Sequence, residues 1–440
     1  MKFTEEPYVK SLNGRGYVQG VIHSKENTPV CLSFTGVRYA FQTKRWERAT
    51  PLPKSFTYGT KEEPARCDMG SKVYPQLEWD GGFKEDSWSE DCFQVNIWVP
   101  SEEPPACGWP VLVFLHGGWL QSGTPNDFKP SALISEGFKA IFILPAYRLG
   151  VFGFFYCTQL EEETGDTSNT VGNLGFWDQR LALEWVSENI SLFGGNSDNI
   201  TLAGYSAGAY SAFHQLAYEL NLCNSNIIKR VCMWSNGPGV QPKTRHQAQL
   251  QSEELAAALN IPPVSPRETL EKLRNIPSKE LLTAALSIHT HQFRPITDGA
   301  FIRSGLIQNL DEFARQLIER RVPLMIGECK DEHYLYGLWK PPKEDSREGL
   351  RERLIADYPA QIVNGLMNIY TPTETLPSRF NNWVHAFAVI YADMQVHKLQ
   401  RGLVKTIAQE GGEELLYRYR IEFRMKCVDQ FLPPEAGVTH

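Results

Sequence analysis

The chain has no long apolar run and no surplus of positive charge. Its longest hydrophobic segment, AIFILPAY at 140–147, is far shorter than the ~20 residues of a transmembrane helix and suits a buried strand. The net charge of −7 argues against nucleic acid or an anionic membrane surface as the main partner. The first ten residues, MKFTEEPYVK, carry acidic residues and a proline where a secretory peptide would be apolar. These absences predict a cytoplasmic protein without a membrane span.

Metal-binding cysteine patterns are also missing. The nine cysteines are odd in number and do not show the spacing of a zinc site. Most of them are therefore expected to be small buried hydrophobes, and no metal centre is predicted.

The chain does contain enough apolar sequence for a large core. Of its 440 residues 42% are hydrophobic, and no repeat, low-complexity tract or strong linker divides them. Apolar runs at 111–116 and 321–327 read as buried strands, whereas a helix is predicted from about 173 to Gly194 and a longer helical region over 376–410. This alternation predicts an α/β fold, with a largely parallel sheet covered by helices on both faces. We expect one domain over 1–440, with a mainly helical insert at about 245–320.

One short motif gives the first indication of chemistry. In NITLAGYSAGAYSAFHQL (199–216), a strand-like run meets a helix-like run at Gly204-Tyr205-Ser206-Ala207-Gly208, a G-x-S-x-G pentapeptide. A turn this sharp strains the serine backbone, and the glycines leave room for the neighbouring elements. It presents the Ser206 hydroxyl at a helix N-terminus, as a nucleophile requires. The pentapeptide alone also fits a small-residue turn that packs a helix onto a sheet.

A second glycine-rich turn favours the nucleophile. A serine hydroxyl needs a base, an orienting acid and backbone donors for the developing oxyanion. In VLVFLHGGWLQSG (111–123) an apolar strand leads into His116-Gly117-Gly118-Trp119, a turn suited to supplying such donors together with the Ala207 N–H. Two such turns, each at the end of a predicted strand and in this order, point to acyl transfer.

Longer segments resemble a known family. SEDCFQVNIWVP (89–100) resembles the E-D-C-x-x-x-N signature of type-B carboxylesterases, which include the cholinesterases, and residues 172–208 are similar to that family's whole nucleophile region. FTGVRYA (34–40), YRLGVFGF (147–154) and PITDGAF (295–301) also fit. The resemblance implies an α/β-hydrolase fold with a small N-terminal antiparallel region. It also implies a small-molecule ester as substrate and no cofactor.

The resemblance assigns the remaining catalytic groups. GECKDEHYLY (327–336) resembles the family's G-x-x-x-D-E-G, which makes Glu332 the acid, ahead of its neighbours Glu328 and Asp331. AGVTH (436–440) resembles G-x-x-H, which makes His440 the base. Relatives continue beyond this histidine, so we expect the chain to lack the family's usual C-terminal segment.

The oxyanion donors implied by the resemblance are the N–H groups of Gly118, Trp119 and Ala207, with Gly117 in the same turn. Trp119 stands where the family usually has glycine or alanine. Its indole should restrict the acyl group to short chains. Cys67 and Cys92 stand where secreted relatives form a disulfide, but without a signal peptide we expect reduced thiols that lie close together.

The sequence therefore predicts a serine esterase that works through an acyl-enzyme with a Ser206–Glu332–His440 triad. The alternative is a C-terminally truncated family member that is catalytically weak, or that acts as a binding protein without turnover. His440 is the last residue of the sequence, and chain ends fray unless they are tied down. The identity of the ester and the oligomeric state stay open.

Overall fold

The computed structural model describes residues 2–42, 44–78, 81–164, 172–223, 225–262, 264–338, 340–430 and 432–439. Within these ranges eleven strands form one sheet, in which β6 (Ala65–Arg66) pairs with β2 off the main path. The order along that path is β1 (Thr4–Ser11), β2 (Tyr17–Lys25), β3 (Thr28–Arg38), β7 (Gln94–Pro100), β9 (Ile141–Pro145), β8 (Trp109–Leu115), β10 (Gly195–Tyr205), β11 (Ile228–Trp234), β12 (Leu324–Cys329) and β13 (Leu416–Ile421). Strands β4 (Ala40–Phe41) and β5 (Thr50–Pro51) form a separate pair.

The sheet has a parallel part and an antiparallel part. From β9 through β8, β10, β11 and β12 to β13 every neighbouring pair is parallel. From β1 through β2, β3 and β7 to β9 every pair is antiparallel. The predicted α/β-hydrolase arrangement, with a small antiparallel region at the N-terminus, is confirmed.

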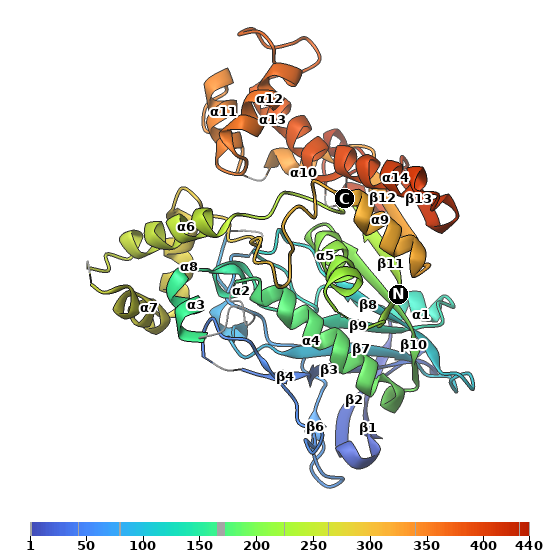
Figure 1. The fold of residues 1–440 in the computed structure, drawn as a ribbon. Coiled ribbons are helices and arrows are strands. Elements are labelled where there is room, and N and C mark those ends of the chain that lie inside the picture. The colour runs from blue at the N-terminus through green and yellow to red at the C-terminus, as the bar shows by residue number, and fades with distance from the viewer. Residues whose placement is uncertain are drawn as a thin grey trace.

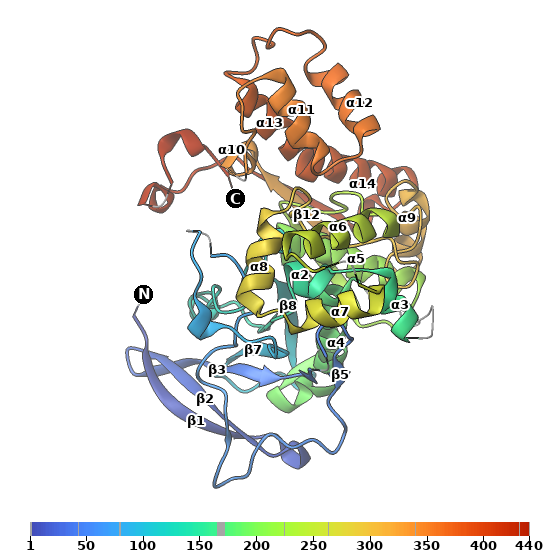
Figure 2. The ribbon, with the colours of Figure 1, turned by 90° about the vertical axis from the view of Figure 1, so that its left-hand side faces the viewer.

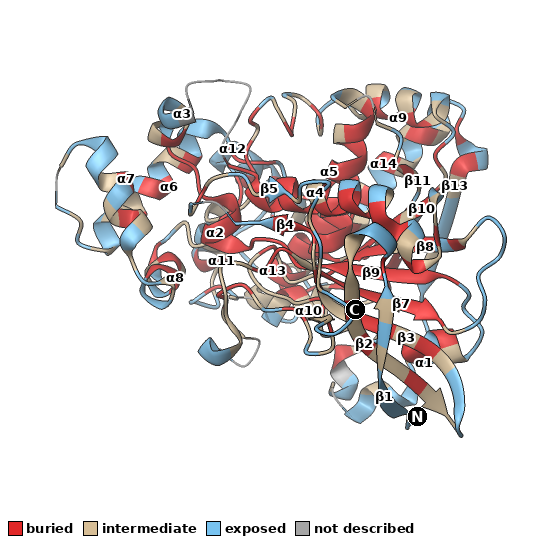
Figure 3. Ribbon diagram, turned by 90° about the horizontal axis from the view of Figure 1, so that it is seen from below, coloured by how far each residue is buried: buried red, intermediate tan, exposed pale blue. Residues whose placement is uncertain are grey.

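Both faces of the central strands are buried. On β8, Val111, Val113 and Leu115 belong to the main core, which also contains residues of α4 (Leu174–Asn189) and α5 (Ala207–Asn221). Phe114 points to the opposite face, into a smaller cluster that includes Ile134 of α1 (Ser131–Ser135). Because alternate side chains enter different cores, the strand reads as a continuous apolar run. Figure 3 shows these strands as buried segments between partly exposed helices.

Two groups of helices lie outside the layers formed by the sheet and the helices that cover it (Figures 1 and 2). The segment expected as a helical insert contains α6 (Arg245–Ala258), α7 (Pro266–Asn275) and α8 (Ser278–Ser287), which form the first group. It also contains α9 (Leu310–Glu319), which instead lies beside α5 and contributes to the main core. A second group has its own apolar cluster and consists of α10 (His333–Leu338), α11 (Arg347–Ile355), α12 (Ala360–Tyr370) and α13 (Trp383–Ala392). The other helices are α2 (Gly150–Phe154), α3 (Thr158–Thr164) and α14 (Lys398–Gln409). The division of the chain into domains stays a prediction.

Helix boundaries agree with the sequence where a clear stop signal exists. Helix α4 begins one residue after the predicted start, and its continuation as a 3₁₀ turn ends at Gly194, which has a φ of 85°. The helical region expected over 376–410 begins at Trp383 and consists of two α-helices joined by a π-helical turn, Asp393–His397. None of the helices in the described ranges is long and apolar enough to cross a bilayer.

Candidate active site

Ser206 occupies a strained turn between β10 and α5. Its φ of 55° and ψ of −122° lie outside the regions that a serine normally adopts, at a cost of about 1–3 kcal/mol. Its N–H donates to the Trp234 carbonyl at 2.8 Å, and its carbonyl accepts from the Ala209 N–H at 2.9 Å. The backbone on both sides of the residue is therefore fixed, and the serine is held in this conformation.

The glycines on either side allow β10 and α5 to approach closely. A Cβ added to Gly204 would lie 2.0 Å from the Gly208 carbonyl oxygen. A Cβ added to Gly208 would lie 2.0 Å from the Leu115 carbonyl oxygen at the end of β8. Any side chain at either position would move the helix away from the sheet and Ser206 with it.

The glycine-rich turn after β8 lies against this serine. A Cβ added to Gly117 would lie 3.1 Å from the Ser206 Cβ. Gly118 has a φ of 106° and Trp119 a φ of 55°, which is unusual for a bulky side chain. Within the described part of the chain, the N–H groups of Gly118 and Ala207 donate to no protein acceptor. They are therefore available to an oxygen bound beside Ser206.

His116 holds this turn and is unsuited to be the base. It is buried, its ring stacks on Tyr147 with centroids 4.4 Å apart, and its Nδ1 lies 2.9 Å from the Gly117 carbonyl oxygen. Burial lowers the pKa of His116 to about 4, so the ring is neutral at pH 7.

Glu332 is fully buried just after β12. Its Oε1 accepts a hydrogen bond from the Cys329 N–H at 2.9 Å. The pKa of Tyr205, the residue before Ser206, is raised mainly by burial and next by the Glu332 carboxylate. This effect indicates that Glu332 lies near the turn at Ser206. The neighbouring acid Glu328 instead pairs with Arg418 at 3.2 Å and with two other arginines around it.

Asp331 fixes the segment that leads to His440, which itself lies outside the described residues. The Asp331 N–H donates to the Val438 carbonyl at 2.7 Å, and Asp331 Oδ2 accepts from the Val438 N–H at 2.8 Å. Arg424 Nη1 also donates to the Gly437 carbonyl at 2.6 Å. Val438 is thus tied to the residue that precedes Glu332, and Gly437 to Arg424, which the sequence did not predict.

Two cavities meet at Ser206, and Trp119 borders both. The larger has a volume of about 640 Å³ and contacts apolar side chains, among them Phe114, Phe128 and Leu335. It reaches the surface at Lys84, which is exposed. The smaller has a volume of about 40 Å³. The Trp119 indole meets Tyr336 edge-on, with ring centroids 6.5 Å apart.

Sequence reasoning missed two polar residues of the smaller cavity, Gln292 and Arg294. The one signal that could have indicated them is their position directly before the PITDGAF segment.

No metal centre is formed by the described residues, since nowhere among them do three or more His, Cys, Asp or Glu side chains gather suitably. Cys67 and Cys92 are buried thiols without a disulfide in the structure, and burial raises the pKa of Cys67 to about 12. Their oxidation state in solution stays a prediction.

Comparison with known proteins identifies the family. The model of the carboxylesterase family matches residues 5–440. The chain belongs to the carboxylesterase family. It is 41% identical to a carboxylic ester hydrolase of Gibberella moniliformis, over all of this chain and 83% of that protein. It is 32% identical to the para-nitrobenzyl esterase of Bacillus subtilis, over 56% of this chain and 48% of that one. Family membership supports ester hydrolysis, with a small-molecule ester as substrate.

A solved structure resembles the fold. The crystal structure of Aspergillus niger EstA superimposes with a TM-score of 0.78, over 99% of this chain and 80% of EstA. The two sequences are 22% identical, so this likeness concerns the α/β-hydrolase fold alone.

Proposed function

We propose that this carboxylesterase-family chain is a serine hydrolase that cleaves carboxylic esters through an acyl-enzyme. The observation that carries the proposal is the strained Ser206 at the junction of two cavities, beside the available N–H groups of Gly118 and Ala207. Buried Glu332 and the anchored segment before His440 support the acid and the base.

In the first half-reaction, Ser206 Oγ attacks the ester carbonyl carbon while His440 accepts the hydroxyl proton. The N–H groups of Gly118, Trp119 and Ala207 stabilise the oxyanion, each by roughly 3 kcal/mol of barrier. Glu332 orients the imidazole and stabilises its positive charge. The tetrahedral intermediate then collapses, His440 donates its proton to the leaving alkoxide, and the acyl group stays on Ser206.

In the second half-reaction, water attacks the acyl carbon and His440 accepts its proton. Collapse returns the proton to Ser206 Oγ and releases the carboxylic acid. We assign the acyl group to the smaller cavity, because its volume of about 40 Å³ suits the short acyl group that Trp119 is expected to select. The leaving alcohol then occupies the larger cavity, which reaches the surface.

The test is hydrolysis of p-nitrophenyl acetate and butyrate by the purified chain. Ser206→Ala should lower kcat/KM by at least about 10³-fold, because the acyl-enzyme route is lost. Ser211→Ala is the matched control: this serine lies in α5, the helix that follows Ser206, lines neither cavity and donates a hydrogen bond to the Ala207 carbonyl. It should keep turning over both esters.

Equal turnover by Ser206→Ala would refute the proposal. Absence of both turnover and labelling by a fluorophosphonate would favour a binding protein instead.

A further inference from the structure

The smaller cavity beside Ser206 carries hydrogen-bond donors that have no acceptor. Gln292 Nε2, Arg294 Nε and Arg294 Nη1 are buried and unpaired within the described part of the chain. Gln292 is only 4% exposed, and both residues line the cavity. None of the described residues that line it is an aspartate or glutamate. Buried donors are usually satisfied in folded proteins, and because the residues that carry these three line a cavity, a ligand that accepts hydrogen bonds can satisfy them there.

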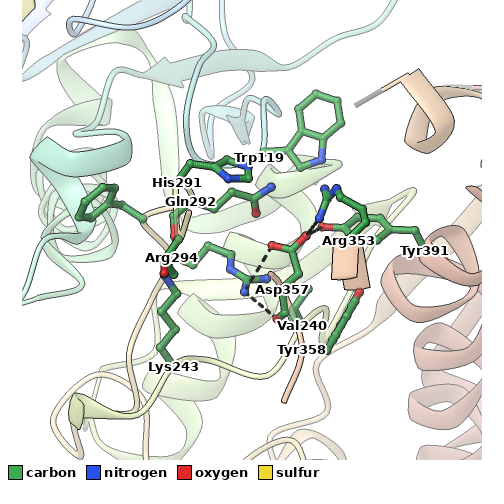
Figure 4. Close-up of polar contacts among 12 residues, drawn as sticks. Trp119, Val240, Lys243, His291, Gln292, Arg294, Arg353, Asp357, Tyr358 and Tyr391 are labelled. Carbon is green, nitrogen blue, oxygen red and sulfur yellow. Dashed lines mark hydrogen bonds and ion pairs between the residues drawn. The ribbon is translucent and has the colours of Figure 1, made fainter. Parts of the chain in front are cut away.

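The charges behind the cavity leave a positive surplus. Figure 4 shows Arg294 and Arg353 on either side of Asp357. Asp357 Oδ2 accepts from Arg353 at 2.6 Å and from the Tyr391 hydroxyl at 3.0 Å, whereas its Oδ1 lies 3.8 Å from Arg294 Nη2. One carboxylate therefore faces two guanidinium groups, and Arg294 is the more weakly paired. An anion in the cavity would balance it.

The titratable side chains near Gln292 and Arg294 do not supply the negative charge that would balance Arg294. Lys243 donates to Gln251 Oε1 at 2.8 Å and to the Gln292 carbonyl at 2.6 Å, and burial lowers its pKa well below the usual value. Burial also lowers the pKa of His291 to about 4, so that this ring is neutral. Glu254 is engaged by the N–H groups of the 289–290 segment.

The donors are held in place relative to the catalytic turn. Gln121, two residues after Trp119, donates from Nε2 to the Phe293 carbonyl at 2.8 Å and accepts from the Phe293 N–H at 3.3 Å. Phe293 lies between Gln292 and Arg294, so their backbone is fixed to the turn that borders Ser206. A preorganised guanidinium loses little entropy when it binds a carboxylate.

We propose that Arg294 and Gln292 bind a carboxylate at the far end of the acyl group, so that the enzyme prefers monoesters of short dicarboxylic acids. This inference rests on the proposed function. A guanidinium forms charge-assisted hydrogen bonds to a carboxylate, and the Gln292 amide adds a neutral donor. The cavity of about 40 Å³ admits only a short spacer between the two carbonyl groups.

The experiment compares ethyl hydrogen succinate with ethyl levulinate, in which a neutral acetyl group replaces the carboxylate. The readout is the ratio of the two kcat/KM values on one preparation, which does not depend on the fraction of active enzyme. The chain itself should give a ratio above one, and Arg294→Gln should lower it by on the order of 10- to 100-fold. Arg294→Lys, which keeps the charge, should lower it less.

Arg303→Gln is the matched control, because Arg303 pairs with Glu312 and lines neither cavity. Its ratio should equal that of the parent chain. A parent ratio below one, or the same ratio in Arg294→Gln, would overturn the inference. Ethyl levulinate hydrolysis that Ser206→Ala abolishes tests the proposed function separately. An altered ratio is therefore assigned to the acyl site alone.

Discussion

Replacing Trp119 with alanine should extend the range of acyl groups that the enzyme accepts. The indole borders both cavities and contacts Tyr336, so its removal joins the cavity of about 40 Å³ to that of about 640 Å³. Octanoate has four more methylene groups than butyrate, and burying each contributes about 0.8 kcal/mol. Full burial would therefore raise the octanoate-to-butyrate ratio of kcat/KM by on the order of 100-fold.

The assay is hydrolysis of p-nitrophenyl butyrate and octanoate by the parent chain, Trp119→Ala and Trp119→Gly. The glycine variant also relieves the positive φ of 55° and is the better-folded form of the same change. Trp383→Ala, a half-buried tryptophan that lines neither cavity, controls for loss of an indole. An unchanged ratio in both Trp119 variants, or faster octanoate than butyrate hydrolysis by the parent chain, would refute the reasoning.

Two further outcomes follow from the structure. Asp331→Ala removes the carboxylate that binds the Val438 N–H at 2.8 Å, so kcat should fall about 10-fold while KM changes less; a change in KM alone would contradict this positioning role. His214 is buried, and its ring nitrogens have no hydrogen-bond partner among the described residues. Burial lowers its pKa from 6.5 to about 3, so its contribution to stability is fully present above pH 6.5 and is lost as the pH falls toward 3. In urea titrations at pH 7 and pH 4.5, His214→Phe should therefore lose less stability than the parent chain, by about 2–3 kcal/mol, and equal losses would refute the assignment.

The elements that could be predicted from the sequence are those marked by their own residues, such as a continuous apolar run or a glycine that ends a helix. Strand β8 is apolar at every buried position, and helix α4 ends where a glycine stops it. The sharp turn at Ser206 could be predicted for a similar reason, because it needs a glycine two residues before the serine and another two residues after it. By contrast, nothing in the composition of the region 376–410 distinguishes a regular α-helix from one interrupted by the π-turn Asp393–His397.

Contacts between distant segments could not be read from the sequence. Asp331 and Val438 are 107 residues apart, and their hydrogen bond depends on how β13 returns the chain to β12. Arg294, Arg353 and Asp357 come together only because α11 packs near the loop before residue 295. In the sequence these charged residues cannot be distinguished from those of a solvent-exposed loop. Only the structure shows that two arginines face one buried carboxylate.

The most direct test of the proposed chemistry is detection of the acyl-enzyme. The chain should be mixed with p-nitrophenyl acetate, quenched with acid within the first turnover and digested for mass spectrometry. An acetyl group should appear on the peptide that contains Ser206, together with the release of the first equivalent of nitrophenol, and should be absent in Ser206→Ala. Turnover without an acetylated peptide, or acetylation at another residue that accounts for turnover, would contradict it.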